Sequence, residues 1–291
     1  MSGMSETNRH PPAVLITGAS TGIGEACALE LERRGFQVFA GIRSEAAGQR
    51  LRGKASPLLM PVMIDVTDAD SICAAATKIK AQTEERGLAG LVNNAGICIS
   101  GPLEIVPIEE LRRQLEVNVI GQIAVMQAVL PLLRIAKGRI VNIGSVNGAL
   151  ASPYLGPYSA SKFAMEALSD ALRIELRTWG ISVSIVEPGP IATPIWEKSV
   201  TAADQLATTI SSQAMQLYEP DLSAVRKCIA KVAGNAEPVD IVVRAVVHAL
   251  TSAKPKTRYF LHFRNRFLFR GFKVVPDVIR DWIICRVMGL P

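Results

Sequence analysis

The chain has 291 residues, of which 49% are hydrophobic and only 5% aromatic, and its formal net charge is +6. This length and aliphatic content predict one large α/β core with buried parallel strands. The five cysteines are scattered and form no CxxC pair, which argues against a disulfide framework and suits a reducing cytoplasm. The three histidines belong to no Cys/His cluster, so no metal site is expected.

The charge is distributed unevenly along the chain. From residue 254 onward there are nine Lys and Arg against two Asp, whereas the preceding part holds 23 basic and 24 acidic residues. A basic tail on a neutral body argues against nucleic acid as a partner and favours a membrane surface or an acidic partner. Residues 1–12 are polar, lack a signal-peptide core and are expected to be disordered. A spanning helix is not expected, because no uninterrupted apolar run reaches 18 residues.

Short apolar runs alternate with longer helical patterns. Strands are expected at 13–17, 36–41, 58–64, 88–92, 139–143, 181–186 and 258–261. Helices are expected at 22–34, 68–86, 107–135, 157–178 and 238–251, with a further helical excursion over 190–236. This alternation predicts βαβ units and a parallel sheet with helices on both faces. The fold class is therefore α/β, a single doubly wound domain over 13–259 followed by an extension over 260–291.

The first strand-to-helix turn is rich in glycine and reads Thr17-Gly18-Ala19-Ser20-Thr21-Gly22-Ile23-Gly24. Glycines at such a junction let the backbone approach a pyrophosphate, and the helix N-terminus offers free N–H donors. The spacing is not GxGxxG, and a tight turn that packs helix on strand is the alternative interpretation. The position after the first strand favours cofactor binding.

The second strand ends without the acidic residue that often holds a ribose 2′-hydroxyl. Arg43 stands there instead and could bind a 2′-phosphate, which favours NADP(H) and leaves NAD(H) as the alternative. A solvated arginine at the start of a helix would give the same pattern.

Tyr158 and Lys162 are four residues apart in a predicted helix, so they share one face. A cation about 4 Å from the phenol would attract the phenolate by roughly 4 kcal/mol and lower the pKa of Tyr158 by up to about 3 units. Such a tyrosine could exchange protons with an alcohol or a carbonyl near neutral pH. Because this spacing also occurs on many helix surfaces, its meaning depends on the other motifs.

The motifs, taken in order, make the chain from Ala13 to Thr193 resemble the short-chain dehydrogenase/reductase family. They are Thr17–Gly24, Asp65-Val66, Asn93-Asn94-Ala95-Gly96, Asn118-Val119-Ile120-Gly121, Gly144-Ser145, Tyr158-Ser159-Ala160-Ser161-Lys162 and Pro188-Gly189-Pro190-Ile191-Ala192-Thr193. The resemblance implies a Rossmann-type domain with about seven strands and an NAD(P)-dependent oxidoreductase acting on CH–OH groups.

The resemblance also implies a catalytic tetrad of Asn118, Ser145, Tyr158 and Lys162. Tyr158 would act as general acid in reduction and general base in oxidation, and Lys162 would lower its pKa and hold the nicotinamide ribose. Ser145 would bind the substrate oxygen, and Asn118 would hold a water that relays protons from Lys162. The expected cofactor contacts are Gly18, Ser20, Thr21, Gly22, Ile23, Gly24, Arg43, Asp65, Val66, Asn94, Ala95, Gly96, Tyr158, Lys162, Pro188, Gly189, Ile191 and Thr193.

The substrate pocket is expected to be mainly apolar, which favours a lipophilic alcohol or carbonyl compound. Its expected residues are Ser145, Val146, Asn147, Leu150, Tyr154, Tyr158 and Trp196. A looser resemblance to the hydroxysteroid and retinol dehydrogenase branch implies a steroid, a retinoid or a similar lipid. The alternatives are a reductase of smaller polar carbonyl compounds and a catalytically silent cofactor-binding or regulatory protein. Epimerases and dehydratases of the extended fold usually carry GxxGxxG, which is absent here.

The extension over 260–291 mixes apolar residues with basic ones. Its charged and aromatic residues include Arg264, Arg266, Arg270, Lys273, Arg280, Trp282 and Arg286. One hypothesis is peripheral contact with an anionic membrane, and the alternative is packing over the protein's own pocket or on a partner subunit. Helices such as 107–135 and 157–178 often form the family's subunit interface, so the resemblance also implies a homodimer or homotetramer.

Overall fold

The computed structural model describes residues 10–208, 210–261 and 275–290. Its seven strands are all parallel and form one sheet in the order β3-β2-β1-β4-β5-β6-β7. They are β1 (Ala13–Ile16), β2 (Gln37–Ile42), β3 (Leu59–Met63), β4 (Gly90–Asn93), β5 (Arg139–Ile143), β6 (Ser182–Glu187) and β7 (Arg258–Phe260). The predicted fold class is confirmed.

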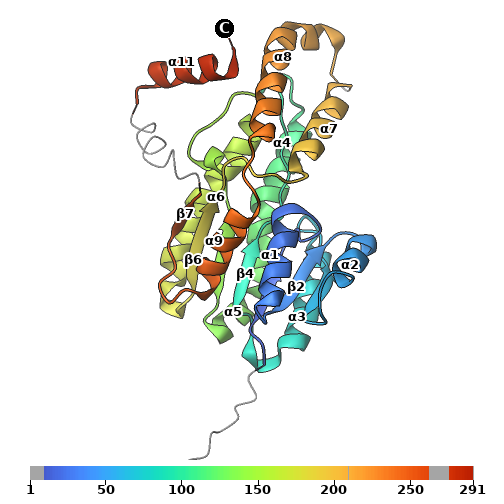
Figure 1. The fold of residues 1–291 in the computed structure, drawn as a ribbon, viewed down its shortest axis with the longest axis vertical. Coiled ribbons are helices and arrows are strands. Elements are labelled where there is room, and N and C mark those ends of the chain that lie inside the picture. Colours follow the sequence, from blue (N-terminus) through green and yellow to red (C-terminus); the bar gives the residue numbers. More distant parts are fainter. Residues whose placement is uncertain (1–9, 209, 262–274, 291) are drawn as a thin grey trace, which may run out of the picture.

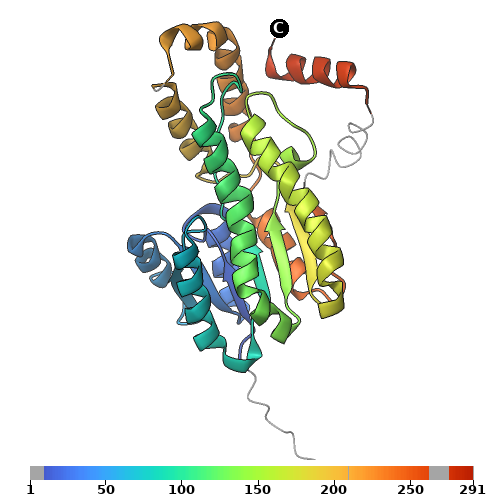
Figure 2. The same cartoon turned by 180° about the vertical axis from the view of Figure 1, so that it is seen from behind.

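Helices cover both faces of the sheet (Figures 1 and 2). One apolar core lies between the sheet and α1 (Gly22–Arg33), α2 (Glu45–Arg52) and α9 (Asp240–Thr251). A second core lies between the other face and α3 (Ala69–Thr83), α5 (Gly121–Ala136) and α6 (Gly156–Glu175). Along β1, Val14 and Ile16 join the first core and Leu15 the second, because side chains alternate across a strand.

The direction of chain winding reverses beside β1. The chain passes from β1 to β2 and β3 on one side, then returns to place β4 on the other side of β1. Ile16 accordingly pairs with Ala40 of β2 and with Val92 of β4. In open α/β sheets, ligands bind outside the carboxyl ends of the strands at such a switch point.

The predicted helix over 107–135 is interrupted in the structure. It comprises α4 (Ile108–Leu115), one π-helical turn (Glu116–Ile120) and α5. By length and composition alone the whole stretch could cross a membrane. Val125, Val129 and Leu133 are instead packed against the sheet, as in the core helix of a globular domain.

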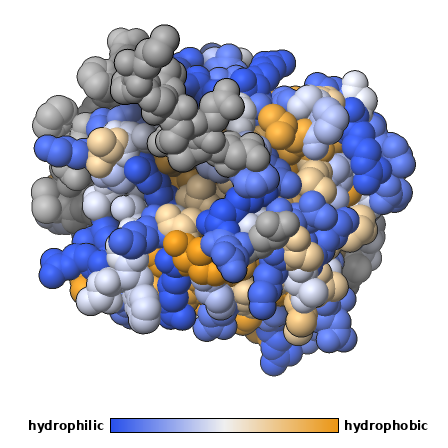
Figure 3. Space-filling view, turned by 90° about the horizontal axis from the view of Figure 1, so that it is seen from below, coloured by the Kyte–Doolittle hydropathy of each residue, from blue (hydrophilic) through white to orange (hydrophobic). Residues whose placement is uncertain are grey.

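Two further helices stand above the carboxyl ends of the strands, where the excursion over 190–236 was predicted (Figure 1). They are α7 (Ile195–Ala207) and α8 (Ser212–Gly234), and α11 (Asp277–Met288) contacts α8. On the surface at the other end of the molecule, away from α7 and α8, polar residues predominate and apolar residues form small groups (Figure 3).

Parts of both predicted terminal segments lie outside the described residues. They are residues 1–9 and, within the basic extension, Arg264, Arg266, Arg270 and Lys273. Shortly after residues 1–9, the Pro12 carbonyl accepts a hydrogen bond from the backbone N–H of Gln37, at 3.0 Å.

Candidate active site

The predicted cofactor and catalytic motifs gather at the carboxyl edge of the sheet. Each follows a strand or lies on a helix that crosses this edge. Gly18, Ser20, Thr21, Gly22, Ile23 and Gly24 follow β1, Arg43 follows β2, Asp65 and Val66 follow β3, Asn94, Ala95 and Gly96 follow β4, Ser145 and Val146 follow β5, and Pro188, Gly189, Ile191 and Thr193 follow β6.

The turn after β1 has the shape of an anion cradle. Gly18 and Gly22 adopt φ values of +64° and +62°, in the left-handed region that favours glycine. A Cβ on Gly24 would lie 2.4 Å from the Gly18 carbonyl oxygen, so helix and turn pack too closely for a side chain. Thr21 is the N-cap of α1, yet its side chain makes no capping bond. The helix N-terminus therefore keeps N–H donors and a positive dipole end suited to the pyrophosphate of NAD(P).

Asn94 holds this turn in place. Its Nδ2 donates to the carbonyl oxygens of Thr17, at 2.9 Å, and Gly18, at 3.0 Å. In return the Thr17 hydroxyl oxygen accepts hydrogen bonds from the backbone N–H groups of Asn94 and Ala95. The asparagine motif after β4 thus stabilises the cradle after β1, a role that the sequence analysis did not foresee.

The ends of β2 and β3 carry opposite charges. Arg43 is exposed, and Asp65 accepts hydrogen bonds from the backbone N–H and the hydroxyl of Thr67. These bonds hold the pKa of Asp65 below its ordinary value, and the charge of Arg43 adds a smaller effect in the same direction. The residue predicted to contact a ribose phosphate thus presents an exposed guanidinium at this edge of the sheet.

α6 presents Tyr158 and Lys162 on one face, as the spacing predicted. The helix begins at Gly156 with Pro157 in its first turn, where the missing N–H of proline removes no helical bond. Lys162 is buried, and its Nζ donates to the Ile143 carbonyl at the end of β5, at 2.8 Å. The same Nζ lies 5.6 Å from the centre of the Tyr158 ring.

The predicted direction of the Tyr158 pKa shift was wrong for this structure. Burial and the nearby Cys98 thiol raise the pKa of Tyr158 above its ordinary value, and a hydrogen bond with Ser145 opposes them. Burial also lowers the pKa of Lys162 to about 8. Because Lys162 donates to Ile143 and is itself desolvated, its charge does not outweigh the cost of ionising the half-buried phenol.

Ser145 is fixed by its neighbours as well as by Tyr158. It caps a short 3-10 helix, and its Oγ accepts from the backbone N–H of Asn147 at 3.1 Å. The backbone N–H of Val146 donates to the Pro188 carbonyl at 3.0 Å, which joins the loops after β5 and β6. The hydroxyl expected to bind substrate is thus held beside the phenol.

Asn118 lies in the π-helical turn and is fully buried. Its Oδ1 accepts from the Ile97 N–H, and its Nδ2 donates to the Ile97 carbonyl and to Ser161 Oγ, at 3.1 Å. These bonds join the loop after β4 to α6. The relay water assigned to Asn118 remains a prediction.

Two of the predicted substrate residues form hydrogen bonds with residues of the excursion over 190–236. The Trp196 indole N–H donates to the Ile191 carbonyl at 2.7 Å, and the Tyr154 hydroxyl donates to Asp221 of α8 at 2.6 Å. Tyr154 lines a hollow of about 450 Å³ with residues of α8 and of the C-terminal segment. The other lining residues are Pro102, Leu103, Glu104, Pro153, Tyr218, Asp221, Cys285 and Leu290. Leu150 follows the 3-10 helix that Ser145 caps.

Cys98 is a site residue that the sequence analysis missed. Its thiol hydrogen-bonds to Ser199 of α7 and is close enough to Lys162 and Tyr158 to influence their pKa values. Burial raises the pKa of the thiol to about 11, so it is uncharged at neutral pH. Its place in the loop after β4, four residues beyond Asn94, was the signal available in the sequence.

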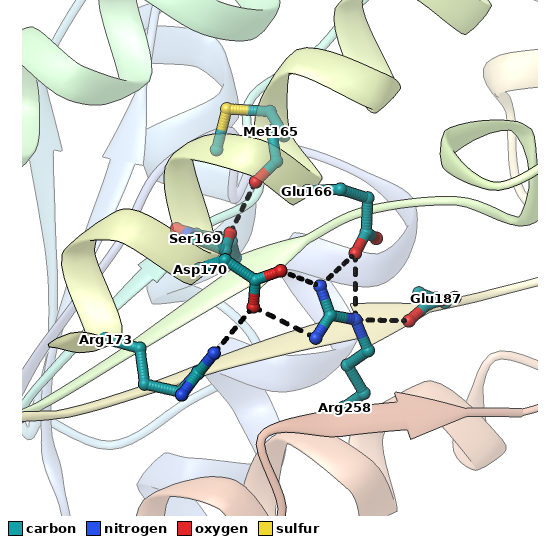
Figure 4. A network of polar contacts seen from close by, with 8 residues as sticks. Met165, Glu166, Ser169, Asp170, Arg173, Glu187 and Arg258 are labelled. Carbon is teal, nitrogen blue, oxygen red and sulfur yellow. Dashed lines mark hydrogen bonds and ion pairs between the residues drawn. The ribbon is translucent and has the colours of Figure 1, made fainter.

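A charged network braces the outer side of α6 (Figure 4). Arg258 of β7 donates to both oxygens of Asp170, at 3.0 and 2.7 Å, and to Glu166, at 3.1 Å. It also lies 3.6 Å from Glu187 at the end of β6. Since Glu166 is one turn beyond Lys162, the network ties the catalytic helix to the two last strands of the sheet.

Comparisons with known proteins agree with this arrangement. A family model described as short chain dehydrogenase matches residues 12–205. The chain is 38% identical over 284 residues to 17-beta-hydroxysteroid dehydrogenase type 6 of Bos taurus, covering 96% of this chain and 89% of that protein. It is 36% identical over 272 residues to retinol dehydrogenase 7 of Mus musculus, covering 92% and 86%. A solved short chain dehydrogenase from Burkholderia cenocepacia J2315, in complex with NADP, has a TM-score of 0.70 at 25% identity, covering 96% of this chain and 98% of that one.

Proposed function

This chain belongs to the short chain dehydrogenase family and is an NAD(P)-dependent oxidoreductase, and from that premise we propose that it interconverts a lipophilic alcohol and its ketone or aldehyde. One observation carries the proposal: Tyr158 shares a helix face with the buried Lys162, whose Nζ lies 5.6 Å from the centre of the Tyr158 ring, and Ser145 lies close enough to lower the pKa of the phenol. These groups stand at the carboxyl edge of the sheet, beside the glycine turn that would hold the cofactor pyrophosphate.

Tyr158 acts as the proton donor when the carbonyl is reduced. When bound, the nicotinamide ring of the cofactor supplies or accepts the hydride. The raised pKa of Tyr158 keeps the phenol protonated at neutral pH, so it can donate to the developing alkoxide. Alcohol oxidation needs the phenolate, and its rate therefore rises with pH. Ser145 orients the substrate oxygen toward this proton.

The proposed substrate is a steroid, a retinoid or a similar lipid. The names of the bovine and mouse relatives support this class, and so does the mainly apolar set of Val146, Leu150 and Trp196. Polar groups around the hollow beside Tyr154, among them Tyr218 and Asp221, favour a second candidate, a smaller polar carbonyl compound. A panel that contains both classes separates them.

The proposed cofactor is NADP(H), with NAD(H) as the alternative. The exposed Arg43 at the end of β2 would pair with a 2′-phosphate, and the Burkholderia relative binds NADP. Arg43→Ala should weaken binding of NADPH more than binding of NADH. Equal weakening of both would count against a 2′-phosphate contact.

The tail contacts an anionic membrane in this proposal, and the chain forms a homodimer or homotetramer. On α11, Val278, Trp282 and Val287 are exposed beside Arg280 and Arg286. Flotation with anionic vesicles, using the full chain and a variant lacking 260–291, tests the first part. Equal failure of both to float would remove the membrane contact.

The central test is a spectrophotometric screen of NADPH and NADH oxidation against steroids, retinal and small polar carbonyl compounds. Tyr158→Phe is the matched control, because it keeps the ring and removes only the proton donor. We expect the variant to bind cofactor like the wild type and to lose turnover by about 10²–10⁴-fold. Unchanged turnover in Tyr158→Phe would refute the mechanism. Cofactor binding without turnover of any substrate by the wild type would favour the catalytically silent alternative.

A further inference from the structure

Two adjacent residues of α7 contact the two halves of the site. The Lys198 Nζ donates to the Thr21 hydroxyl oxygen, in the turn after β1, at 3.1 Å. The next residue, Ser199, lies close enough to the Cys98 thiol to lower its pKa, and Cys98 in turn influences the pKa values of Tyr158 and Lys162. α7 therefore spans from the pyrophosphate cradle to the catalytic groups. Lys198 was not among the predicted site residues, and Trp196 was the one residue of α7 that was.

The position of Lys198 is electrostatically unusual. Thr21 is the N-cap of α1, where the helix dipole places partial positive charge and the first-turn N–H groups point outward. An ammonium group at that end meets charge of its own sign. Glu25, the acidic residue in the first turn of α1, is paired with Lys54 at 2.6 Å. Among the described residues, none of the ion pairs involves Lys198.

A bound anion would offset the repulsion between the Lys198 ammonium group and the positive end of the α1 dipole. The cradle around Gly18 and Gly22 has the backbone shape for a pyrophosphate, and Thr193 packs against Gly22 from the side of α7. An anion held by the α1 N–H groups would lie within reach of the ammonium group that now donates to Thr21. A lysine reaches such an anion as a point charge on a flexible stem.

We propose that Lys198 binds the pyrophosphate of the nicotinamide dinucleotide and thereby holds α7 over the site. The proposal rests on the cofactor-binding function proposed above and adds a contact from outside the sheet edge. It also gives the cofactor a structural effect on the substrate side. Binding fixes Lys198, and with it Ser199 beside Cys98 in the wall near Tyr158.

α7 is suited to such control because few contacts anchor it, among them an exposed ion pair of Asp204 with Arg226 of α8, at 3.0 Å. None of its described side chains is buried. Its first turn is attached through Trp196, whose indole donates to the Ile191 carbonyl, and Ile191 forms an isolated bridge with Glu237. The Lys198 contact is therefore one of a small number that hold the helix in place, and strengthening it can change how firmly α7 is held.

The test compares ligands with and without a pyrophosphate. Binding of NADP⁺, ADP-ribose and 2′-AMP is measured by calorimetry on the full chain and on Lys198→Gln, Lys198→Arg and Lys227→Gln. Lys227 is an exposed lysine of α8 and controls for the loss of one positive charge on the excursion. Thermal midpoints of all four proteins confirm that the substitutions leave the fold intact.

We expect Lys198→Gln to weaken NADP⁺ and ADP-ribose roughly fivefold to tenfold, the size of an exposed charge-assisted contact. Binding of 2′-AMP, which lacks the pyrophosphate, should stay within about twofold of the wild type. Lys198→Arg should retain most of the affinity, and Lys227→Gln should match the wild type for all three ligands. The salt dependence of ADP-ribose binding should be shallower in Lys198→Gln, because one ionic contact is lost.

Two results would overturn the proposal and leave the enzyme assignment standing. One is unchanged ADP-ribose affinity in Lys198→Gln. The other is equal weakening of ADP-ribose and 2′-AMP, which would mean a general charge effect. A wild-type protein that bound neither NADP⁺ nor ADP-ribose would contradict the proposed function itself.

Discussion

The two helices that face the site, α6 and α7, are anchored in different ways. α6 carries Tyr158 and buries Lys162, Met165 and Leu172 against the sheet, and Arg258 braces its outer side. α7 carries the Lys198 and Ser199 contacts, and none of its described side chains is buried. The groups proposed to transfer the proton are thus held by the core, whereas the groups proposed to contact the cofactor from α7 are attached at the surface.

This difference has an energetic basis. Apolar area removed from water stabilises the fold by about 25 cal/mol per Å², so α6 can separate from the sheet only when the core opens. A helix without buried side chains can detach at small cost. We infer that the catalytic geometry persists throughout turnover while α7 can admit and release ligands.

Replacing one serine beside α6 and one serine of α7 tests the difference between the two helices, and the loss of turnover is the largest effect we expect. Ser145→Ala removes the hydroxyl that lowers the pKa of Tyr158 from the end of β5, and we expect kcat to fall about 10²–10³-fold. Ser199→Ala removes the α7 hydroxyl beside Cys98, and we expect a loss of less than about tenfold, because α7 positions no reacting proton. Steady-state kinetics with NADPH measure both losses. Equal losses would mean that α7 is as closely involved in the chemistry as the strand ends.

The free energy of unfolding tests the same difference between α6 and α7, with an expected effect of intermediate size. Met165 of α6 is fully buried, and Met165→Ala should lower the free energy of unfolding by about 2–5 kcal/mol. Val200 of α7 is 47% exposed, and Val200→Ala should change it by no more than about 0.5 kcal/mol. Urea denaturation at fixed temperature gives both values. A large loss in Val200→Ala would show that α7 belongs to the cooperative core.

The Arg258 brace gives the smallest expected effect and depends on pH. Arg258 lowers the pKa of Asp170 from 3.8 to about 2, so the pair stabilises the fold fully above pH 4 and loses this contribution as pH falls toward 2. Arg258→Gln should cost about 1 kcal/mol at pH 7, because the pair is partly exposed to solvent. The difference from the wild type should shrink between pH 4 and pH 2 in urea titrations.

Arg280→Gln is the control for this titration. Arg280 pairs with Asp277 on the exposed α11, three residues away, and its loss should change stability little at any pH. A difference between Arg258→Gln and the wild type that stayed constant from pH 7 to pH 2 would exclude Asp170 as the titrating group.

Local sequence patterns were sufficient to predict the strands and turns that carry the candidate site. Strands β1 to β7 lie within one or two residues of the predicted positions, because buried parallel strands are short aliphatic runs between turn residues. Gly18, Gly22 and the Tyr158–Lys162 spacing indicated the cradle and the catalytic face, since both depend on residues close together in the chain. The π-helical turn at Asn118 was not predictable, because its cause is the long-range bonding of Asn118 with Ile97 and Ser161.

What the sequence determined by itself is the set of chemical groups and the order in which they follow the strands. The tertiary structure alone decided their environments. Burial reversed the expected pKa shift of Tyr158, since desolvation depends on everything packed around the phenol and not on the lysine one turn away. The tertiary structure also brought Lys198 to Thr21, which is 177 positions away in the chain. No local sequence pattern could have placed an ammonium group at this end of α1.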